Sequence, residues 1–580
     1  ILAANRISYD LYMITEFNKE KNIEIIRRLN NELNYNISED LAEYSYQPQL
    51  LIKDIGEESY NNIQTAIPAF SNIYIKSPSV RFYPYKEIGF HVLGYVSLIT
   101  EELLKNEKYK EYDPLDYIGH YGIEEIFEGE LKGKDGIELD IINAFGKPIY
   151  NPEIVDFNEI KQILKRELEK KTVSGNDIYL TIDLELQKKA EELLGDQRGA
   201  IIIQETKTGE ILAMVSHSTI DGNIFIKGIS TDAWSRIKND PSYPLINRTI
   251  QGKYSPGSIF KLILAFAMLD QDLLMTEEKF KPCKGKIELD NVIKYCWREK
   301  GHGDVKLQEA IAYSCNIYFY QLGKMLGIDT IEKYAKMFNL DKRTGIILTG
   351  EKKGLIPSRN WKRDFFEKPD DKKWWPPETL DLSIGQGFIV LTPLSIATLL
   401  SSIANQGKIL KPIIVKDIIT RNETYESKSQ PVIVKTIEIS QDNFKTVNQA
   451  LFEVVNKRKP RWGSGWKAYV KNLEVCGKTG TAQVVKLTEE RHSTLGDQSD
   501  IPYQFRDHAW FAGFAPFSDP QVTIIVLIEH GGYGGSIAAP IAAELFKECQ
   551  KLKFIKTNLT LEQEKKDEKD IKKTEPVNPD

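Results

Sequence analysis

The chain has 580 residues, 41% of them hydrophobic. That is enough for sizeable cores but too long for one ordinary domain, so we expect two or three. The net charge of −6 at pH 7 and the pI of about 5.9 argue against nucleic acid as the main partner. Five cysteines, an odd number, do not indicate a framework of disulfide bonds.

The N-terminal residues carry no targeting signal. No apolar run approaches the roughly 20 residues of a membrane-spanning helix, and no signal peptide is present. The chain begins with Ile1-Leu2-Ala3-Ala4-Asn5 rather than with Met, as if in the middle of a structured region. We therefore expect the native protein to continue upstream of Ile1.

Residues 1–172 form the first predicted domain. They are rich in charge, Tyr, Asn and Ile, and they give mixed helical and strand signals. They contain Arg81-Phe82-Tyr83-Pro84 and Gly122-Ile123-Glu124, but no group of titratable side chains that indicates chemistry. A scaffold or interaction module is favoured for this domain.

The pattern changes near residue 173, and residues 173–555 form the second predicted domain. The spacing of apolar residues predicts strands and helices in alternation. A turn and a strand are expected at 175–183, and further strands at 200–203, 211–216, 475–485, 510–515 and 522–528. Helices are expected at 184–194, 262–269, 307–340, 392–403 and 538–551. This order indicates an α+β protein with an antiparallel sheet flanked by helices. Residues 556–580 are rich in Lys, Glu and Asp and predict a disordered tail.

Ser258-Ile259-Phe260-Lys261 is the first candidate catalytic motif. Pro256 and Gly257 end the preceding segment, and the apolar run after Lys261 predicts a buried helix with Ser258 as its N-cap. A Lys three residues after a Ser lies on the same helix face and, if kept neutral, can take the proton of the hydroxyl. On this stretch alone, an ordinary capped helix with a solvent-facing Lys is the simpler interpretation.

Two later stretches change that balance. Ser314-Cys315-Asn316 and Lys478-Thr479-Gly480-Thr481 follow the first motif in the chain, the latter on a predicted strand. Each motif is a weak signal alone. S-x-x-K, S-x-N and K-T-G in that order are typical of the penicillin-recognising serine acyltransferases.

The wider context resembles the class B penicillin-binding proteins, most closely the elongation type represented by penicillin-binding protein 2. The resemblance covers nearly the whole chain and includes Arg81-x-Tyr83-Pro84, Gly122-Ile123-Glu124, Leu180-Thr181-Ile182-Asp183, Asn247-Arg248, Gly385-Gln386-Gly387, Thr392-Pro393 and His508-x-Trp510-Phe511. It implies a non-catalytic N-terminal pedestal followed by a penicillin-binding transpeptidase domain. A membrane helix upstream of Ile1 would then anchor the protein at the periplasmic face of the inner membrane.

The activity that this resemblance implies is a peptidoglycan D,D-transpeptidase that cross-links stem peptides during cell-wall elongation. Beta-lactam antibiotics would inhibit it by mimicking the D-Ala–D-Ala end of the donor. The implied partner is a SEDS-family glycosyltransferase in the elongation complex of the inner membrane, contacted through the N-terminal module.

The resemblance assigns a role to each motif residue. Ser258 attacks the carbonyl, and Lys261 accepts its proton. Ser314 relays a proton toward the leaving nitrogen, and Asn316 holds the substrate amide and orients Lys261. Lys478 presents positive charge to the terminal carboxylate and, as a like charge, lowers the pKa of Lys261.

The strand that carries K-T-G supplies the substrate-binding residues. Thr479 and Thr481 alternate along it with Gly480, whose missing side chain is expected to let the substrate approach. If this strand lies at an edge of the sheet, the stem peptide can pair with it. The backbone N–H groups of Ser258 and Thr481 are the expected oxyanion hole.

Cys283, Cys296, His302 and Cys315 form a second constellation. Three thiolates and one imidazole are the ligand set of a closed tetrahedral zinc site, and some members of the resembled family hold zinc at matching positions. Cys315 is the middle residue of S-x-N, so a metal there would fix that loop from behind. A Cys283–Cys296 disulfide, or plain buried cysteines, are the alternatives. Cys476 and Cys549 are expected to be structural thiols.

Other functions fit less well. A phosphate-binding loop at Gly477-Lys478-Thr479 would need a Gly where Asn472 stands. His508 and His530 are expected to be structural, because the Ser/Lys mechanism does not need them. A beta-lactamase or carboxypeptidase of the same superfamily would lack the N-terminal module, and a catalytically silent beta-lactam-binding scaffold or sensor would not need intact motifs.

Overall fold

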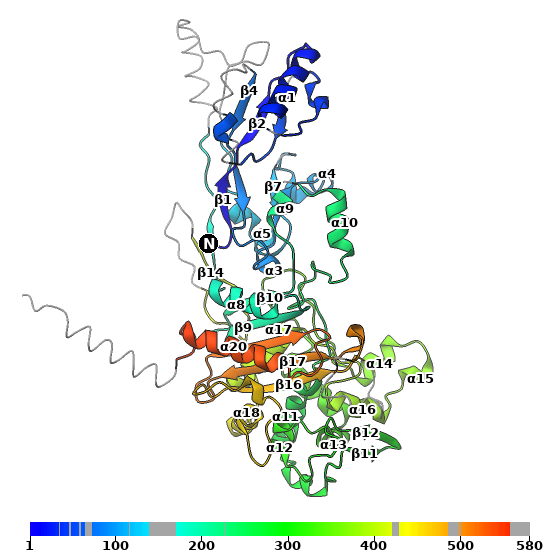
Figure 1. The fold of residues 1–580 in the computed structure, drawn as a ribbon. Helices are drawn as coiled ribbons and strands as arrows, with labels where there is room; N and C mark the ends of the chain where they lie inside the picture. Colours follow the sequence, from blue (N-terminus) through cyan, green and yellow to red (C-terminus); the bar gives the residue numbers. More distant parts are fainter. Residues whose placement is uncertain are drawn as a thin grey trace, which may run out of the picture. The chain divides into compact units, whose positions relative to one another are not determined.

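The structure, a computed structural model, describes residues 1–33, 35–45, 48–56, 60–63, 72–114, 116–137, 170–226, 228–419, 429–484, 498 and 500–556. It divides into two compact units, which are described separately (Figure 1). The first contains Ile1–Ile178 and Ile220–Arg236, and the second contains Tyr179–Thr219, Ile237–Asp417 and most of the remaining chain. Residues 557–580 of the predicted tail lie outside the described residues. In the described part of the chain, no helix combines the length and the apolar character needed to cross a membrane.

The first unit contains a three-stranded antiparallel sheet in the order β3-β2-β4. β2 (Asp10–Met13) is its central strand, and its inward side chains meet those of α1 (Lys19–Leu33) in one apolar core. α1 forms because Ile and Leu at helical spacing, Ile26 and Leu29 among them, place one apolar stripe against the sheet. The other elements of the unit are β1 (Ala4–Ile7), β3 (Gln49–Ile52), β4 (Ile73–Lys76), β5 (Ser79–Phe82), β6 (Val96–Leu98), β7 (Tyr117–Gly119), α3 (Phe90–Leu93), α4 (Glu101–Leu104), α5 (Gly122–Ile126), α6 (Glu128–Leu131), α9 (Asn223–Ile226) and the first part of α10 (Thr231–Asn239).

The two N-terminal motifs meet inside this unit. Arg81 on β5 donates from Nε to Oε1 of Glu124 on α5 at 2.6 Å, and the Tyr83 hydroxyl donates to the same oxygen at 3.1 Å. Glu124 is buried, so this ion pair is shielded from water. Breaking such a pair leaves a buried charge without a partner, which costs about 3–5 kcal/mol. These motifs therefore serve the structure of the unit.

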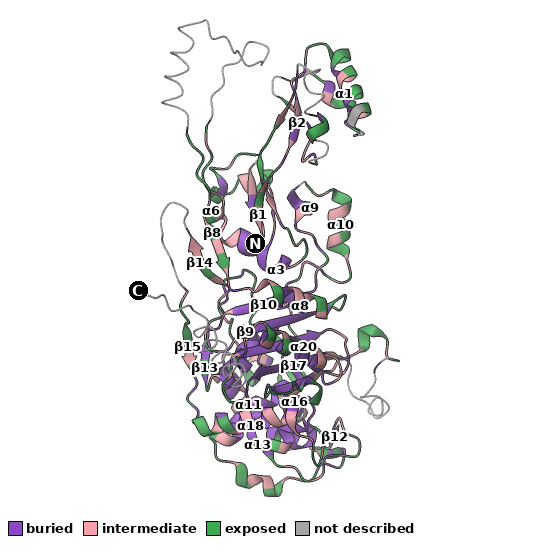
Figure 2. Ribbon diagram, turned by 60° about the vertical axis from the view of Figure 1, so that its left-hand side comes forward, coloured by how far each residue is buried: buried purple, intermediate pink, exposed green. Residues whose placement is uncertain are grey.

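The second unit is built on a five-stranded antiparallel sheet in the order β10-β9-β18-β17-β16. The strands are β9 (Gly199–Glu205), β10 (Ile211–Ser216), β16 (Cys476–Ala482), β17 (His508–Ala515) and β18 (Val522–Ile528). Every residue of β18 is buried, so the sheet is covered on both faces (Figure 2). The predicted antiparallel sheet is confirmed, including the 200–216 hairpin.

Helices cover this sheet. α8 (Leu184–Leu194) and α20 (Ala538–Lys551) have the predicted bounds and pack together, α8 on β9 and β10 and α20 on β17 and β18. α17 (Pro393–Ala404) packs on β9, β17 and β18 and is buried along its whole length. The remaining elements are α11 (Lys261–Asp270), α12 (Leu307–Ala312), α13 (Asn316–Met337), α14 (Arg359–Phe365), α15 (Pro369–Lys372), α16 (Pro376–Ser383), α18 (Gln441–Asn456), β8 (Asp177–Leu180), β11 (Lys286–Leu289), β12 (Val292–Tyr295), β13 (Lys408–Leu410), β14 (Val415–Ile419) and β15 (Ile433–Thr436).

The helical segment predicted at 307–340 is interrupted. α12 ends at Ala312 and α13 begins at Asn316, with Ser314 between them at a φ of +55°. A left-handed residue cannot continue a helix, so the chain turns sharply there. The prediction of one continuous helix was wrong at the S-x-N motif, which occupies the turn.

Candidate active site

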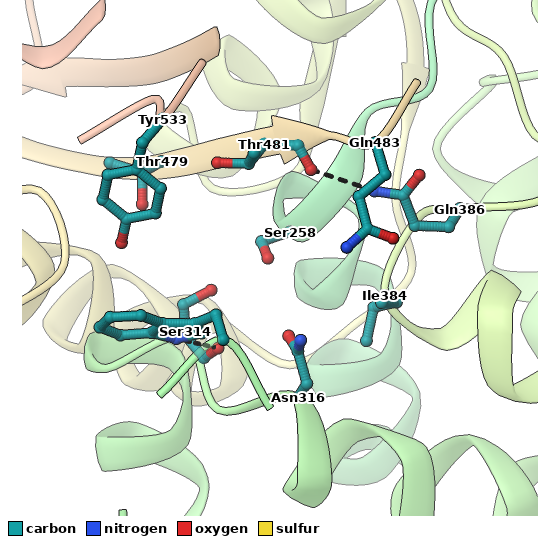
Figure 3. A pocket seen from close by; sticks show the side chains of 10 residues that line it. Ser258, Ser314, Asn316, Ile384, Gln386, Thr479, Thr481, Gln483 and Tyr533 are labelled. Carbon is teal, nitrogen blue, oxygen red and sulfur yellow. Dashed lines mark hydrogen bonds between the residues drawn. The ribbon is translucent and has the colours of Figure 1, made fainter. Parts of the chain in front are cut away.

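Ser258 lies on a 3₁₀ turn, Gly257–Ile259, directly before α11. The prediction that Ser258 caps this helix was wrong. The helix starts at Lys261, its N-cap position is Phe260, and no side chain caps it. The tight turn bonds the Phe260 N–H to the Gly257 carbonyl at 3.0 Å. The Ser258 hydroxyl is therefore not needed as a cap and points into the cleft (Figure 3).

Lys261 is fully buried below this turn. Its Nζ donates to Asn316 Oδ1 at 2.7 Å, to the Ser314 carbonyl at 3.0 Å and to Ser314 Oγ at 3.3 Å. Burial lowers the pKa of Lys261 to about 8, partly opposed by the nearby cysteine thiols. No hydrogen bond among the described residues joins Ser258 to Lys261. Such catalytic contacts often tighten only when substrate binds.

Lys478, on β16, contacts the Ser314 hydroxyl that Lys261 also contacts. Its Nζ donates to Ser314 Oγ at 2.9 Å and to the Thr479 carbonyl at 3.1 Å. Burial, followed by the neighbouring Lys261, lowers the pKa of Lys478 well below its ordinary value. Burial is therefore the main cause of the lowered pKa at both lysines, and the predicted like-charge effect between them is the second cause at Lys478. Two buried ammonium groups sharing one hydroxyl disfavour the doubly charged state.

β16 is an edge strand of the five-stranded sheet, which meets the condition set for pairing with the stem peptide. Thr479 and Thr481 line the cleft. Gly480 is not among the lining residues, and its role in letting the substrate approach stays a prediction. A Cβ at Gly480 would lie 2.9 Å from the Pro256 carbonyl oxygen and 3.0 Å from Trp510 Cβ. This position is a glycine because the turn before the nucleophile and β17 pack directly on it.

The backbone of the nucleophile turn lies against β16. A Cβ on Gly257, which has a φ of +53°, would lie 2.7 Å from the carbonyl oxygen and 3.1 Å from the nitrogen of Thr481. The Gly257 N–H donates to the Gly385 carbonyl at 3.1 Å. The turn is therefore held on two sides, with residues 257 and 481 in contact. That the N–H groups of Ser258 and Thr481 form an oxyanion hole stays a prediction.

The cleft is also lined by five residues that the motifs did not identify as site residues. They are Trp297, Ile384, Gln386, Gln483 and Tyr533 (Figure 3). The Trp297 indole N–H donates to the carbonyls of Tyr313 and Ser314, both at 3.0 Å, and its ring lies 5.9 Å from that of Tyr533. Gln386 donates to the Thr481 carbonyl at 3.0 Å. Gln386 is the middle residue of the Gly385-Gln386-Gly387 motif, and that motif could have identified it as a cleft residue. Trp297 gave no signal beyond its place next to Cys296.

The four predicted metal ligands converge. Cys283, Cys296, His302 and Cys315 are buried, and their ligand atoms all lie within 4.8 Å of one another. His302 Nδ1 is 3.4 Å from Cys296 Sγ and 3.7 Å from Cys283 Sγ. A tetrahedral zinc with bonds of about 2.0–2.3 Å needs ligand atoms about 3.5–4 Å apart, so these residues fit the ion. The three cysteines are free of disulfide bonds, so the Cys283–Cys296 alternative is not present.

The other cysteines and the two histidines lie away from the cleft lining. Cys476 and Cys549 are buried free thiols. The His530 N–H donates to His508 Nδ1 at 3.0 Å, and burial lowers the pKa of His508 to about 4. His508 is therefore neutral at physiological pH.

A buried Lys beside a cleft Ser, a second Ser bonded to two lysines and an edge strand together define a serine acyltransferase of the penicillin-recognising type. Comparison with known families agrees. Residues 199–547 match the penicillin binding protein transpeptidase domain, and residues 1–180 match the penicillin-binding protein dimerisation domain. The chain belongs to the penicillin-binding proteins and is an enzyme of their transpeptidase class.

Among its relatives is the peptidoglycan D,D-transpeptidase MrdA of Haemophilus influenzae, 31% identical over 94% of this chain and 82% of that one. Penicillin-binding protein 2 of Helicobacter pylori, solved in complex with MreC, is similar in structure, with a TM-score of 0.75, 25% identity and 96% of each chain covered. A chain from a structure of a peptidoglycan synthase complex that coordinates polymerization and crosslinking matches with a TM-score of 0.70 and 27% identity. The match covers 94% of this chain and 87% of that one.

Proposed function

We propose that this enzyme is a peptidoglycan D,D-transpeptidase that cross-links stem peptides during cell-wall elongation. The observation that carries the proposal is the position of Ser258 in a cleft above the buried contacts of Lys261 and Lys478 with Ser314. A relative of that activity at 31% identity over nearly the whole chain supports it.

Acylation begins at Ser258. Its Oγ attacks the carbonyl between the last two D-Ala residues, and neutral Lys261 takes the hydroxyl proton. The C–N bond then breaks, and the departing D-Ala nitrogen receives a proton through Ser314, which both lysines contact. The products are an ester on Ser258 and free D-Ala.

Deacylation repeats these steps with a second stem peptide. Its side-chain amine attacks the ester carbonyl, a new amide bond forms, and the Ser258 C–O bond breaks. The proton lost by the amine returns to Ser258 Oγ through the same groups. The Asn316 side chain, which holds Lys261 by accepting at 2.7 Å, keeps the base in place during both steps.

The donor peptide is expected to lie along β16. An edge strand offers unpaired backbone groups to an extended peptide, and Thr479 and Thr481 of this strand line the cleft. Lys478 is fully buried and attracts the terminal carboxylate through its charge rather than by an exposed contact. A bound carboxylate in turn favours the protonated form of Lys478.

The enzyme is also proposed to hold one structural zinc ion at Cys283, Cys296, His302 and Cys315. A closed site with four protein ligands supplies no catalytic water and acts on the fold alone. Cys296 and Cys315 precede Trp297 and Asn316, so fixing these cysteines fixes a wall of the cleft and the S-x-N turn. Metal analysis of the purified protein, with Cys296→Ser as the control, tests this.

The cellular setting is proposed from the relatives. An inner-membrane anchor upstream of Ile1 would place the enzyme in the periplasm, and its partners would be an MreC-like protein and a SEDS-family glycosyltransferase. Structures of the similar proteins with MreC and in a peptidoglycan synthase complex support partners of this kind.

The test supplies glycan strands that carry pentapeptides and separates the digested products by mass. Cross-linked dimers together with released D-Ala support a transpeptidase. Released D-Ala without dimers would indicate a carboxypeptidase. If neither product forms and the protein still binds penicillin, the result would indicate a sensor. Ser258→Ala should form no dimer.

A further inference from the structure

A strongly basic segment precedes the K-T-G strand. Six of the residues at 457–471, called the basic loop below, are Lys or Arg, and no Asp or Glu occurs anywhere from residue 454 to residue 473. The chain as a whole has a net charge of −6, so this concentration of positive charge is local. The loop follows α18 and leads back into β16 (Figure 1), the strand whose Thr479 and Thr481 line the cleft.

Most of these charges have no acidic partner. Lys457 pairs with Glu453 at 2.8 Å and lies 3.5 Å from Glu309. The other five cations have no carboxylate within ion-pair distance in the described part of the chain. They are Arg458, Lys459, Arg461, Lys467 and Lys471. Clustered unpaired cations raise the local concentration of anionic ligands.

Aromatic rings are exposed among the cations. Trp462, Trp466 and Tyr469 are 53%, 40% and 47% exposed. The two Trp rings meet edge to face at 4.4 Å, and the Arg458 guanidinium lies 5.1 Å from the Trp462 ring and 4.8 Å from the Tyr469 ring. These contacts hold the rings in a fixed arrangement, and 40–53% of each residue's surface stays exposed to solvent. Large rigid rings of this kind are anchors at binding surfaces.

The base of the basic loop is fixed to the active site. The Thr479 hydroxyl donates to Ser464 Oγ at 3.2 Å, and the Ser464 N–H donates to the Ala312 carbonyl, two residues before Ser314, at 2.9 Å. The Arg461 guanidinium donates to the carbonyl of His302. The loop is therefore continuous with the cleft, although none of its residues lines the cleft itself.

We propose that the basic loop binds the acceptor strand of peptidoglycan, with its cations on the carboxylates of the stem peptide and its aromatic rings on the sugar rings. The proposal rests on the transpeptidase function above. The donor occupies the cleft until it is acylated, so a site beside the cleft stays free for a second strand. Stem peptides end in carboxylates, and sugar rings present apolar C–H faces, so the loop matches both parts of the ligand.

The position of the basic loop disfavours other occupants. A membrane surface would match the positive charge, but the groups that anchor the loop belong to the substrate cleft. The donor strand cannot be the occupant that matters after acylation, because its peptide is then covalently held in the cleft. The test below separates both cases from the acceptor.

The test uses a fluorescent disaccharide-pentapeptide as the probe and enzyme whose Ser258 is blocked by a penicillin. The variant removes three exposed, unpaired charges: Lys459→Gln, Lys467→Gln and Lys471→Gln. Its matched control removes three exposed charges elsewhere in the same unit: Lys342→Gln, Lys352→Gln and Lys353→Gln. Three weak charge contacts together predict about tenfold weaker probe binding in the loop variant and no change in the control.

Salt and turnover provide the second readout. Binding to the wild type should weaken as salt rises from about 0.05 M to 0.5 M, and the loop variant should respond much less. In turnover, the KM for the disaccharide-peptide acceptor should rise, while the KM for glycine as a small acceptor should not. Trp466→Ala should also weaken binding of the probe, and this loss of affinity should not depend on the salt concentration.

Several results would overturn the proposal: equal probe affinity in the loop variant and the wild type, equal losses in both triple variants, or complete loss of probe binding when Ser258 is blocked, which would identify donor binding. Binding of the loop to anionic vesicles but not to the probe would identify a membrane surface instead. If penicillin does not acylate Ser258 at all, the transpeptidase proposal fails separately, and probe binding to unblocked protein still decides the role of the loop.

Discussion

The pH dependence of acylation tests the role given to Lys261. Its side chain is fully buried, and burial lowers its pKa to about 8 from an ordinary value of 10.5. A Lys accepts a proton only when it is neutral. The acylation rate should therefore rise with pH, level off above the pKa and fall as pH drops below it.

The size of the effect follows from the pKa. Below its pKa, the neutral fraction of a Lys falls about tenfold for each pH unit. With a pKa of about 8, roughly one-tenth of Lys261 is neutral at pH 7 and roughly nine-tenths at pH 9, a rise of about tenfold. A Lys at the ordinary value of 10.5 would be only about 0.03% neutral at pH 7, and the rate would still be climbing at pH 10.

The assay is stopped-flow acylation by a fluorescent penicillin at saturating concentration, from about pH 6 to pH 10. Saturation keeps the drug carboxylate in the site, which favours protonated Lys478 and leaves Lys261 as the group that titrates. Ser258→Ala gives the baseline. A rate that is flat between pH 7 and pH 9, or that rises tenfold per unit up to pH 10, would refute the assignment of a buried, neutral Lys261 as base.

Three further predictions concern the walls of the site. If the proposed zinc is present, Cys296→Ser should release it, lower the melting temperature and slow acylation; one metal per chain in both proteins would contradict the proposed ligand set. Trp297→Phe removes the indole N–H bonds to the S-x-N turn, worth about 1 kcal/mol each, and should slow acylation by penicillin about tenfold while leaving the metal content unchanged; an unaltered rate would show that the turn holds its position without them. Gly480→Ala places a Cβ against the Pro256 carbonyl and Trp510 and should lower stability by about 1–3 kcal/mol, measured by denaturant unfolding; a neutral effect would favour the view that this glycine serves the substrate.

Much of the second unit could be predicted because its elements carry strong local signals. β18 is seven consecutive apolar or Thr residues, and α20 and α8 have clear helical spacing, so their bounds followed from the pattern. The catalytic side chains could be predicted because the three motifs occur in order. The structure then brings Lys261, Ser314 and Lys478 together, although up to 217 positions separate them in the chain (478 − 261).

The failures lie where local propensity loses to tertiary contacts. Ser258 would be a good cap, but the chain enters α11 through a 3₁₀ turn that satisfies its own backbone donors. Ser314 interrupts a helical pattern because a left-handed turn is needed to aim its hydroxyl at the two lysines. The packing of Gly480 against Pro256 was not foreseen, because it depends on a segment more than 200 residues away.

The remaining cleft residues could not be predicted, since no spacing identifies them. Trp297 and Tyr533 come from separate loops and meet only in the folded protein. The basic loop is visible in the sequence as a run of Lys and Arg, yet the overall net charge of −6 conceals it. Its significance depends on the hydrogen bond between Ser464 and Thr479, which only the structure shows.

The most direct test of the central claim is the intact mass of the protein after incubation with a beta-lactam, for the wild type and for Ser258→Ala. We predict a single adduct of the mass of the drug that persists for minutes in the wild type and is absent from the alanine variant. Rapid consumption of the drug without an adduct would indicate a beta-lactamase, and an unmodified protein with intact drug would contradict Ser258 as the nucleophile.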